Sequence, residues 1–389
     1  MHPDEKNELE KIDENDQYDM DVVEKEDVGP PKITNPYDPD KIKVDQQNVN
    51  LGFLIEMLEN DEIDLMPEFQ RSMDLWNATQ KSQLIESLLL GLPLPSFYFS
   101  EDVKSGKWLV VDGLQRLCTF KDFIVKKTLS LTGLEFLDYY EGKRYNDLSR
   151  EEKRKISGAK INFYVIEKQT PSNVKFLIFK RVNTGGLVLT PQEMRHALNQ
   201  GVPARFIEKL SKVEAFKKAT CNIIKTRRME DRDFANRFVA FYLLGYEDNY
   251  EGELDKFLND GMEKLAKTTE SERIEIKEAF KKSMELSFAI FGNYAFRKRY
   301  DLQERRRRPI SKAVYDTISV NLAWLSDNEQ ETLNNKKNEF RSKLINLFNH
   351  DELFYRSITT GTGQKSNIKI RFEKIKNLIG EVLKHDKTN

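Results

Sequence analysis

Cysteine and histidine are scarce in this chain of 389 residues, which contains two cysteines and four histidines. Two cysteines cannot build a disulfide framework, so Cys118 and Cys221 are predicted to be reduced, buried thiols in apolar helical surroundings. The histidines follow no metal-binding pattern such as H-x-E or H-x-x-x-H, and none is paired with a cysteine. The sequence therefore does not support a zinc site or a histidine-based catalytic triad at His2, His196, His350 or His385.

Long apolar runs are also lacking. No run approaches the roughly 20 residues that cross a bilayer, and no signal peptide opens the chain. We therefore expect a cytoplasmic protein that does not enter a membrane.

Charge is distributed unevenly, although the net charge is only −1. Residues 1–29 contain twelve acidic residues and three lysines, which leaves a net charge of +8 for residues 30–389. Because the acidic stretch has no apolar periodicity, residues 1–40 are predicted to be a disordered tail. Two interpretations stay open: the tail increases solubility, or it competes with DNA for a basic face of the protein.

Residues 41–200 have an α/β pattern. Strands are predicted at 97–99, 109–111 and 161–166, and helices at 53–58, 114–126, 171–182 and 190–199. Thr190-Pro191-Gln192-Glu193 has the capping-box pattern with proline at the first helical position, so Thr190 and Glu193 are predicted to be structural.

Asp112-Gly113-Leu114-Gln115-Arg116 joins an apolar strand to a helix through a glycine turn. Asp112 would lie at the carboxyl end of the strand, and Arg116 one helical turn later. A guanidinium near a helix start suits a phosphate group, although an ordinary capped turn would have the same pattern.

Two further segments carry polar side chains outside predicted helices. Gln70 and Arg71 follow Pro67 in an irregular stretch, and Asn183 precedes Gly185 and Gly186. These residues could contact a ligand, or Arg71 could be a surface arginine and Asn183 a helix terminator.

The spacing of these motifs resembles the N-terminal domain family of GmrSD-type restriction systems, a family with the ParB and sulfiredoxin-like fold. The resemblance runs from about Phe53 to Leu198 and includes Pro67-Glu68-Phe69-Gln70-Arg71, Leu92-Pro93-Leu94-Pro95 and the Asp112 motif. The family motif is Asp-Gly-Gln-Gln-Arg, and Leu114 replaces its first glutamine. An apolar side chain forms no hydrogen bond, so Leu114 is expected to lose that contact or simply to pack.

Residues 201–389 are predicted to be mostly α-helical, which gives an α+β protein of two domains. A basic cluster near aromatic residues in this part suits DNA phosphates, and a solvated loop is the alternative. The cluster consists of Arg297, Lys298, Arg299, Arg305, Arg306, Arg307 and Arg308. Residues 360–367 are expected to form a flexible loop, with Ser366 or Asn367 capping the last helix.

The resemblance implies a nucleoside triphosphate and Mg²⁺ as ligands, with DNA as a partner. Arg71 and Arg116 would hold phosphates, Asp112 would hold Mg²⁺ or orient water, and Gln70, Gly113, Gln115 and Asn183 would complete the nucleotide site. The alternative is a non-catalytic DNA-binding or regulatory module. Since His350 lacks the context of an HNH nuclease, DNA cleavage would be the task of a separate nuclease subunit.

Overall fold

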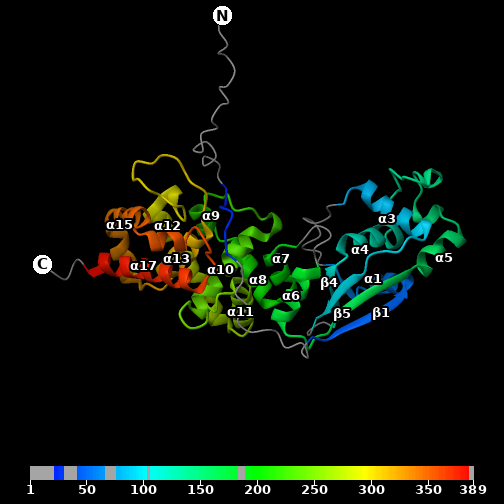
Figure 1. The fold of residues 1–389 in the computed structure, drawn as a ribbon, viewed down its shortest axis with the longest axis horizontal. Helices are drawn as coiled ribbons and strands as arrows, with labels where there is room; N and C mark the ends of the chain where they lie inside the picture. Colours follow the sequence, from blue (N-terminus) through cyan, green and yellow to red (C-terminus); the bar gives the residue numbers. More distant parts are fainter. Residues whose placement is uncertain (1–21, 30–41, 66–75, 103–105, 183–188, 385–389) are drawn as a thin grey trace, which may run out of the picture. The chain divides into compact units, whose positions relative to one another are not determined.

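The computed structural model describes residues 22–29, 42–65, 76–102, 106–182 and 189–384. Their contacts divide the chain into two compact units (Figure 1). Residues 36–198 form the first unit, here called the sheet domain. Residues 199–389 form the second unit together with residues 1–35, here called the N-terminal segment. This second unit is called the helical domain.

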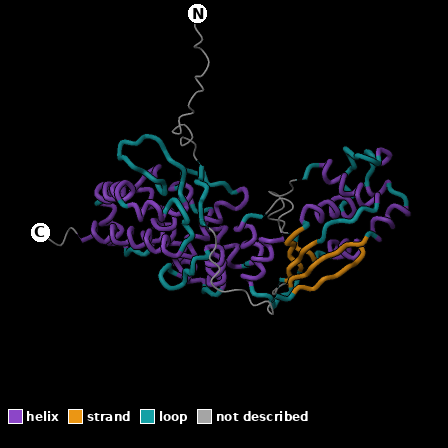
Figure 2. The backbone as a smooth tube through the Cα atoms, in the orientation of Figure 1, coloured by secondary structure: helices purple, strands orange, loops and turns teal. Residues whose placement is uncertain are grey.

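The sheet domain contains a mixed sheet with the strand order β1-β5-β3-β4-β2 (Figure 2). β3 is parallel to β5 and antiparallel to β4, while β1 pairs antiparallel with β5 and β2 pairs parallel with β4. The strands are β1 (Val44–Asn50), β2 (Ile63–Asp64), β3 (Phe97–Glu101), β4 (Trp108–Asp112) and β5 (Lys160–Ile166). Together with the helical domain, this sheet confirms the predicted α+β class.

Helices α1 (Leu51–Glu59), α3 (Ala78–Leu90), α4 (Leu114–Phe120) and α5 (Arg150–Gly158) share one apolar core with the strands. Its aromatic centre consists of Phe97, Phe99, Phe120, Phe123 and Phe163, all with no exposed surface. α4 continues into a π-helical turn over Lys121–Val125. Outside this core, α6 (Ser172–Val182) contacts β4, and α7 (Pro191–Leu198) contacts α6.

The predicted cap of α7 is present. The Thr190 backbone N–H donates to Glu193 Oε2 over 2.7 Å, and the Glu193 backbone N–H donates to Thr190 Oγ1 over 3.1 Å. These two bonds satisfy donors that a helix start leaves unpaired, which confirms the structural role of both residues.

The helical domain is built around α13 (Lys312–Ala323), in which Ala313 to Leu322 are all buried. This helix contacts α10, α12 and α17, and its apolar residues belong to one large core. The described helices of the domain are α8 (Val202–Ser211), α9 (Glu214–Ala219), α10 (Glu230–Leu244), α11 (Leu254–Ala266), α12 (Glu270–Phe291), α13, α14 (Asp327–Asn335), α15 (Lys337–His350), α16 (Glu352–Ser357) and α17 (Lys365–Lys384). Among the residues that the structure describes, no helix is long and apolar enough to cross a membrane.

Both cysteines are free, but their surroundings differ. Cys118 is buried in α4, as predicted. Cys221 is half-buried in the turn after α9, where its φ of 55° is left-handed. The predicted helical surroundings are therefore wrong for Cys221.

Residues 22–29 are an ordered part of the helical domain, so the prediction of a disordered tail is wrong for this stretch. Val23 forms a β-bridge with Ile310, and the Glu24 backbone N–H donates to the Ile310 carbonyl over 2.8 Å. Farther along, the carbonyls of Asp27 and Val28 accept hydrogen bonds from Thr362 and Gly363. The prediction failed because the partners that hold this segment lie more than 200 residues farther along the chain.

Buried charges reinforce this attachment. Glu26 accepts two hydrogen bonds of 2.9 Å from Arg237, whose guanidinium also donates to both oxygens of Asp316 over 2.8 and 2.6 Å. Arg371 approaches the same Asp316 carboxylate to 3.5 Å, and Asp316 and Arg371 are completely buried. Two carboxylates and two guanidiniums thus link the N-terminal segment to α10, α13 and α17.

The glycine-containing stretch 360–367 is fixed rather than flexible, which corrects the sequence-based expectation. Besides its bonds to residues 27 and 28, this stretch receives a hydrogen bond from Arg371 to the Thr362 carbonyl over 2.6 Å. α17 already begins at Lys365, and the Asn367 amide donates back to the carbonyls of Thr360 and Gly361. Ser366 and Asn367 are therefore inside the helix and not at its cap.

Replacing Glu26 should weaken the helical domain strongly. Burial alone would raise the pKa of Glu26, but Arg237, Lys312 and Arg371 lower the pKa below its ordinary value of 4.5. We expect Glu26→Gln to lower the free energy of unfolding by about 3 kcal/mol at pH 7, because the buried guanidinium of Arg237 loses one of its two carboxylate partners. The difference from wild type should shrink below about pH 4.5, as acid protonates the wild-type carboxylate in the unfolded and then the folded state.

Glu24→Gln is the matched control for this experiment. Glu24 pairs with Lys298 over 2.5 Å, but its side chain is 36% exposed, so the change should cost less than about 1 kcal/mol. Urea unfolding of both variants from pH 3 to pH 7 measures the difference. If both variants lost the same free energy of unfolding, the buried charge network would stabilise the domain no more than an exposed ion pair does.

Candidate functional site

The turn from β4 to α4 positions the Asp112 motif. Buried Val110 and Val111 lead to Asp112, the last residue of β4, and Gly113 follows with a left-handed φ of 98°. A Cβ atom at Gly113 would lie 2.4 Å from Cδ1 of Phe97. The turn therefore requires glycine both for its backbone conformation and for the close approach of β3.

Arg116 lies close to this turn and binds the two residues that precede β3. Its guanidinium donates to the carbonyls of Pro95 and Ser96, the latter over 3.1 Å, and to Asp112 Oδ2 over 3.1 Å. The guanidinium carbon lies 4.2 Å from the ring centre of Phe97. Arg116 thus holds Asp112, β3 and α4 in one arrangement.

Charge in this turn is partly shielded from water. The side chains of Arg116 and Asp112 are 10% and 32% exposed. Burial lowers the pKa of Arg116, while the Asp112 carboxylate opposes the shift. Since an arginine in a protein keeps its proton, Arg116 remains a cation next to a carboxylate that solvent can reach.

Tyrosine rings lie beside Asp112. Tyr98 pairs with Asp112 across β3 and β4, and its ring stacks on Tyr164 of β5 with centres 4.8 Å apart. Burial raises the pKa of Tyr98, and Tyr164 and Asp112 add to the shift. Gln115 accepts a hydrogen bond of 3.4 Å from the Trp76 backbone N–H.

The structure therefore brings together four of the predicted nucleotide-site residues, namely Asp112, Gly113, Gln115 and Arg116. Gln70, Arg71 and Asn183 lie outside the described residues. Sequence reasoning missed Phe97, Tyr98 and Tyr164 as neighbours of the motif. Side chains of a strand alternate between the two faces of the sheet. The sequence Phe97-Tyr98-Phe99 could therefore have indicated that Tyr98 lies on the face opposite to the two phenylalanines, where a polar residue of a neighbouring strand could meet it.

Leu114 packs against the core of the sheet domain and is partly buried. Of the two expectations for this residue, packing is the one that the structure displays. Leu114 thus contributes apolar contacts at the position where the family motif has glutamine.

Asp112 is the candidate ligand for Mg²⁺. The described residues contain no group of three or more His, Cys, Asp or Glu side chains that could hold a metal ion. Mg²⁺ in nucleotide sites is commonly bound by one or two carboxylates together with phosphate oxygens and water. A single, partly exposed carboxylate fits that kind of site.

Several members of the basic cluster bind the protein itself. Arg297 is 3% exposed and donates to the Arg308 carbonyl. Lys298 pairs with Glu24, and Arg308 pairs with Glu304 over 2.9 Å. Direct phosphate contact by Arg297 is incompatible with this burial.

Arg299 and the segment Arg305–Arg307 complete the cluster. Arg299 donates to the carbonyls of Asp301 and Leu302 and lies 4.0 Å from the ring centre of Tyr294. Arg305 is exposed, and Arg306 and Arg307 are half-buried. DNA contact by Arg305, Arg306 and Arg307 stays a prediction, and Arg305 is the exposed residue of the three.

The sheet domain is thus a mixed sheet with helices, in which the turn from β4 to α4 carries the polar Asp112 motif. Residues 54–199 match the family model described as the N-terminal domain of the GmrSD restriction endonuclease, which confirms the resemblance over this part of the chain. The match covers less than half of the 389 residues. The comparisons with curated proteins and with solved structures gave no match. Residues 54–199 are thus similar to the N-terminal domain of a restriction endonuclease.

Gly113→Ala tests the tight turn. The new methyl group would collide with Phe97, and φ of 98° is unfavourable for alanine, so we expect the sheet domain to lose about 2–3 kcal/mol of stability. Gly142→Ala is the matched control because its φ is also positive but nothing lies within 4 Å of the added methyl group. Thermal unfolding of both variants separates the collision with Phe97 from backbone strain. Equal destabilisation would contradict the need for close approach at Gly113.

Replacing Arg305, Arg306 and Arg307 with alanine tests DNA contact. If all three touch phosphates, the slope of log affinity against log salt concentration should become shallower by about three units for any DNA sequence. The matched control removes three positive charges from exposed positions elsewhere, at Arg356, Lys369 and Lys376. Fluorescence anisotropy with a DNA duplex measures both slopes. An unchanged slope in the first variant would identify the segment as a solvated loop.

Proposed function

We propose that the sheet domain binds a nucleoside triphosphate with Mg²⁺ and that this binding serves a DNA restriction system. The observation that carries the proposal is the position of Asp112 at the end of a mostly buried strand, next to Gly113 and 3.1 Å from the guanidinium of Arg116. This arrangement lies inside the segment that matches the restriction-system family.

Each side chain has a distinct role in the proposal. Asp112 holds Mg²⁺ together with phosphate oxygens or orients the attacking water, and Gln115 fixes the nucleotide or that water. Arg116 supplies positive charge to the phosphates while its bonds to the start of β3 keep Asp112 in place. Gln70, Arg71 and Asn183 keep the roles that the sequence predicts for them.

Hydrolysis of the nucleotide would be slow and coupled to DNA binding. Bound Mg²⁺ would neutralise charge that develops on the phosphates. A separate nuclease subunit would perform the DNA cleavage.

Two features favour a second candidate function, a non-catalytic DNA-binding or regulatory module. Leu114 packs into the core, and Arg116 already donates to two carbonyls and a carboxylate. In such a module the same residues would stabilise a domain that contacts nucleic acid without turnover. Measuring nucleotide hydrolysis with and without DNA distinguishes the two functions, because DNA-stimulated turnover requires the first.

Replacing Arg116 and Asp112 should separate binding from turnover. We expect Arg116→Ala to weaken triphosphate binding by about 2–3 kcal/mol, the value of a charge-assisted hydrogen bond in a partly desolvated site. Asp112→Asn keeps the shape but removes the charge that attracts Mg²⁺, so turnover should fall more than binding. Calorimetry and a phosphate-release assay measure the two quantities.

Arg154→Ala is the control because it removes an exposed positive charge from α5. Melting curves show whether each variant is folded, which matters for Arg116 because of its bonds to β3. A folded Arg116→Ala protein that binds nucleotide as well as wild type would contradict the phosphate role. Equal loss of binding and turnover in Asp112→Asn would make Asp112 a structural residue.

A further inference from the structure

Residues 298–309, here called the basic loop, are closed at their base by an antiparallel β-bridge between Arg297 and Ile310. The Tyr294 hydroxyl donates to the Arg305 carbonyl over 2.9 Å, which attaches the middle of the loop as well. The arginines of this loop are therefore carried by a backbone that is fixed to the helical domain.

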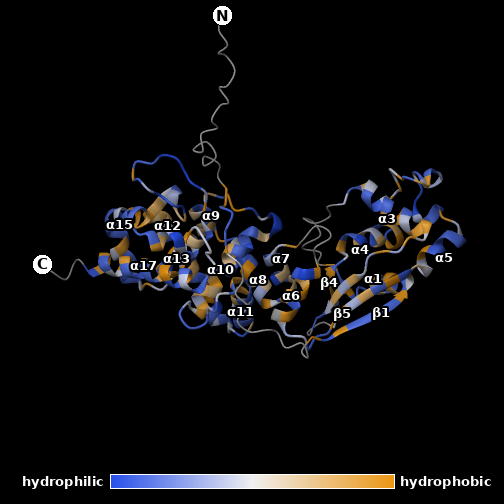
Figure 3. Cartoon of the chain, in the orientation of Figure 1, coloured by the Kyte–Doolittle hydropathy of each residue, from blue (hydrophilic) through white to orange (hydrophobic). Residues whose placement is uncertain are grey.

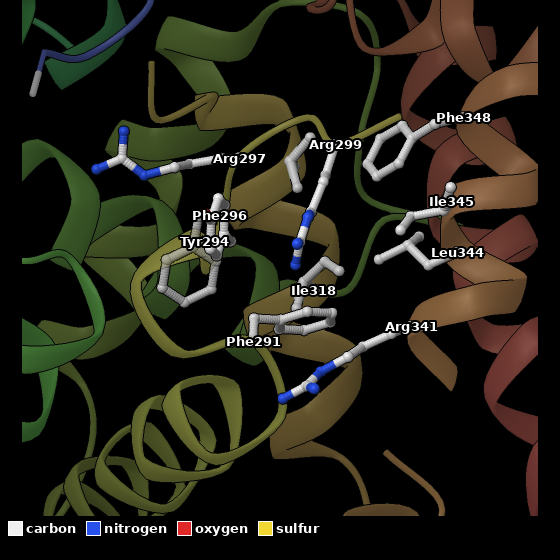
Figure 4. Close-up of a pocket in the computed structure, with 11 residues that line it drawn as sticks. Phe291, Tyr294, Phe296, Arg297, Arg299, Ile318, Arg341, Leu344, Ile345 and Phe348 are labelled. Atoms are coloured by element: carbon white, nitrogen blue, oxygen red, sulfur yellow. The ribbon is translucent and has the colours of Figure 1, made fainter. Parts of the chain in front are cut away.

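The first arginines of the cluster bind the protein itself. Arg297 donates to the Arg308 carbonyl, and Arg299 donates to carbonyls of the basic loop. In Figure 4 Arg299 extends toward Phe291 beside a small cavity, whereas Arg297 extends in another direction. Arg305, by contrast, is exposed, and two half-buried arginines follow it. Arg305–Arg307 is therefore the stretch of the loop in which an exposed cation and two further cations are consecutive.

The N-terminal segment lies against the base of the basic loop. Val23 forms a parallel β-bridge with Ile310, and the Ile310 backbone N–H donates to the Val22 carbonyl over 3.0 Å. Because the pairing is parallel, both chains run in the same direction through the bridge. The chain that precedes Val22 therefore joins the bridge from the same side as residues 305–309, which precede Ile310.

Opposite charges meet at this junction. Glu24, just after the bridge residue Val23, pairs with Lys298 of the basic loop over 2.5 Å. Residues 1–21, which lie outside the described residues, contain nine acidic residues and two lysines, a net charge of −7. The basic loop contains six basic and two acidic residues, a net charge of +4. The acidic residues are thus joined covalently to the domain beside a surface of opposite charge.

The length of the acidic stretch allows contact with the whole loop. Twenty-one residues reach at most about 70 Å when fully extended, and a flexible chain of this length spans about 25 Å on average. A segment tethered at such a distance has an effective concentration in roughly the millimolar range. Weak ion pairs between exposed groups are then sufficient for frequent contact.

We propose that residues 1–21 occupy the surface of Arg305–Arg307 and that DNA must displace them to bind there. The occupant is this segment of the same chain because its charge is opposite and its attachment lies next to the loop. Displacement is possible because a duplex offers a dense row of phosphates and releases counterions when it binds. The acidic residues therefore lower the affinity for DNA below the value that the arginines alone would give.

Replacing acidic residues near the attachment point tests the proposal on the full chain. The variant combines Asp16→Asn, Asp19→Asn and Asp21→Asn. Loss of three exposed ion pairs frees the arginines for most of the time, so DNA binding should tighten roughly fivefold at low salt. Fluorescence anisotropy with a DNA duplex at about 50 mM salt measures the affinity, and the difference from wild type should shrink at higher salt because screening weakens both contacts.

A matched control removes three negative charges from exposed positions elsewhere in the helical domain. It combines Glu275→Gln, Glu278→Gln and Glu331→Gln. This variant should change the affinity much less, because its charges are not tethered to the basic loop.

A second comparison locates the competition. The three Asp→Asn changes are combined with alanine at Arg305, Arg306 and Arg307, and melting curves show that the variants are folded. Either no tightening or a complete loss of DNA binding in this background places the competition on these arginines.

Four results would overturn the proposal. The first is an unchanged affinity in the Asp→Asn variant, and the second is equal tightening in the matched control, which would indicate general charge repulsion. The third is tightening that persists without the three arginines, which would place the effect on another surface. The fourth is that neither wild type nor the Asp→Asn variant binds DNA. None of these results depends on nucleotide binding at Asp112 and Arg116, so the two proposals fail independently.

Discussion

The packing of the helical domain depends on the buried carboxylate of Asp316. It has no exposed surface and lies between the guanidiniums of Arg237 and Arg371. A charge taken out of water is costly unless it is fully paired, so the helices that carry these residues must meet in one arrangement. Arg237 extends the requirement to Glu26, which makes the N-terminal segment part of the same electrostatic unit.

Arginine has a similar structural function in the sheet domain. Arg116 binds the carbonyls of Pro95 and Ser96, just before β3, and the carboxylate at the end of β4. The motif that suggests phosphate binding is thus also the motif that joins two strands to a helix. Pre-organisation of this kind lets a site keep its geometry when a charged ligand arrives.

Local patterns predicted the elements with strong periodicity. β4, β5 and α7 appear where apolar spacing or a capping box indicated them, and the described part of residues 201–389 is mostly helical, as predicted. β1 was missed because its sequence is polar and it forms an edge of the sheet, as its mostly hydrophilic colour in Figure 3 illustrates. The burial of Arg297 could not be predicted, since it depends on a chain reversal that places the Arg308 carbonyl beside it.

The same limit applies to the acidic segment, whose composition alone resembles a solvated tail. Glu26 is ordered because Arg237, 211 residues away, supplies the opposite charge. The helical domain is consequently discontinuous in sequence, with the whole sheet domain inserted between its two parts. At translation rates of about 5–20 residues per second, Glu26 leaves the ribosome roughly 10–40 seconds before its partner. During synthesis the sheet domain can fold in that interval, whereas the helical domain must wait until both of its pieces exist.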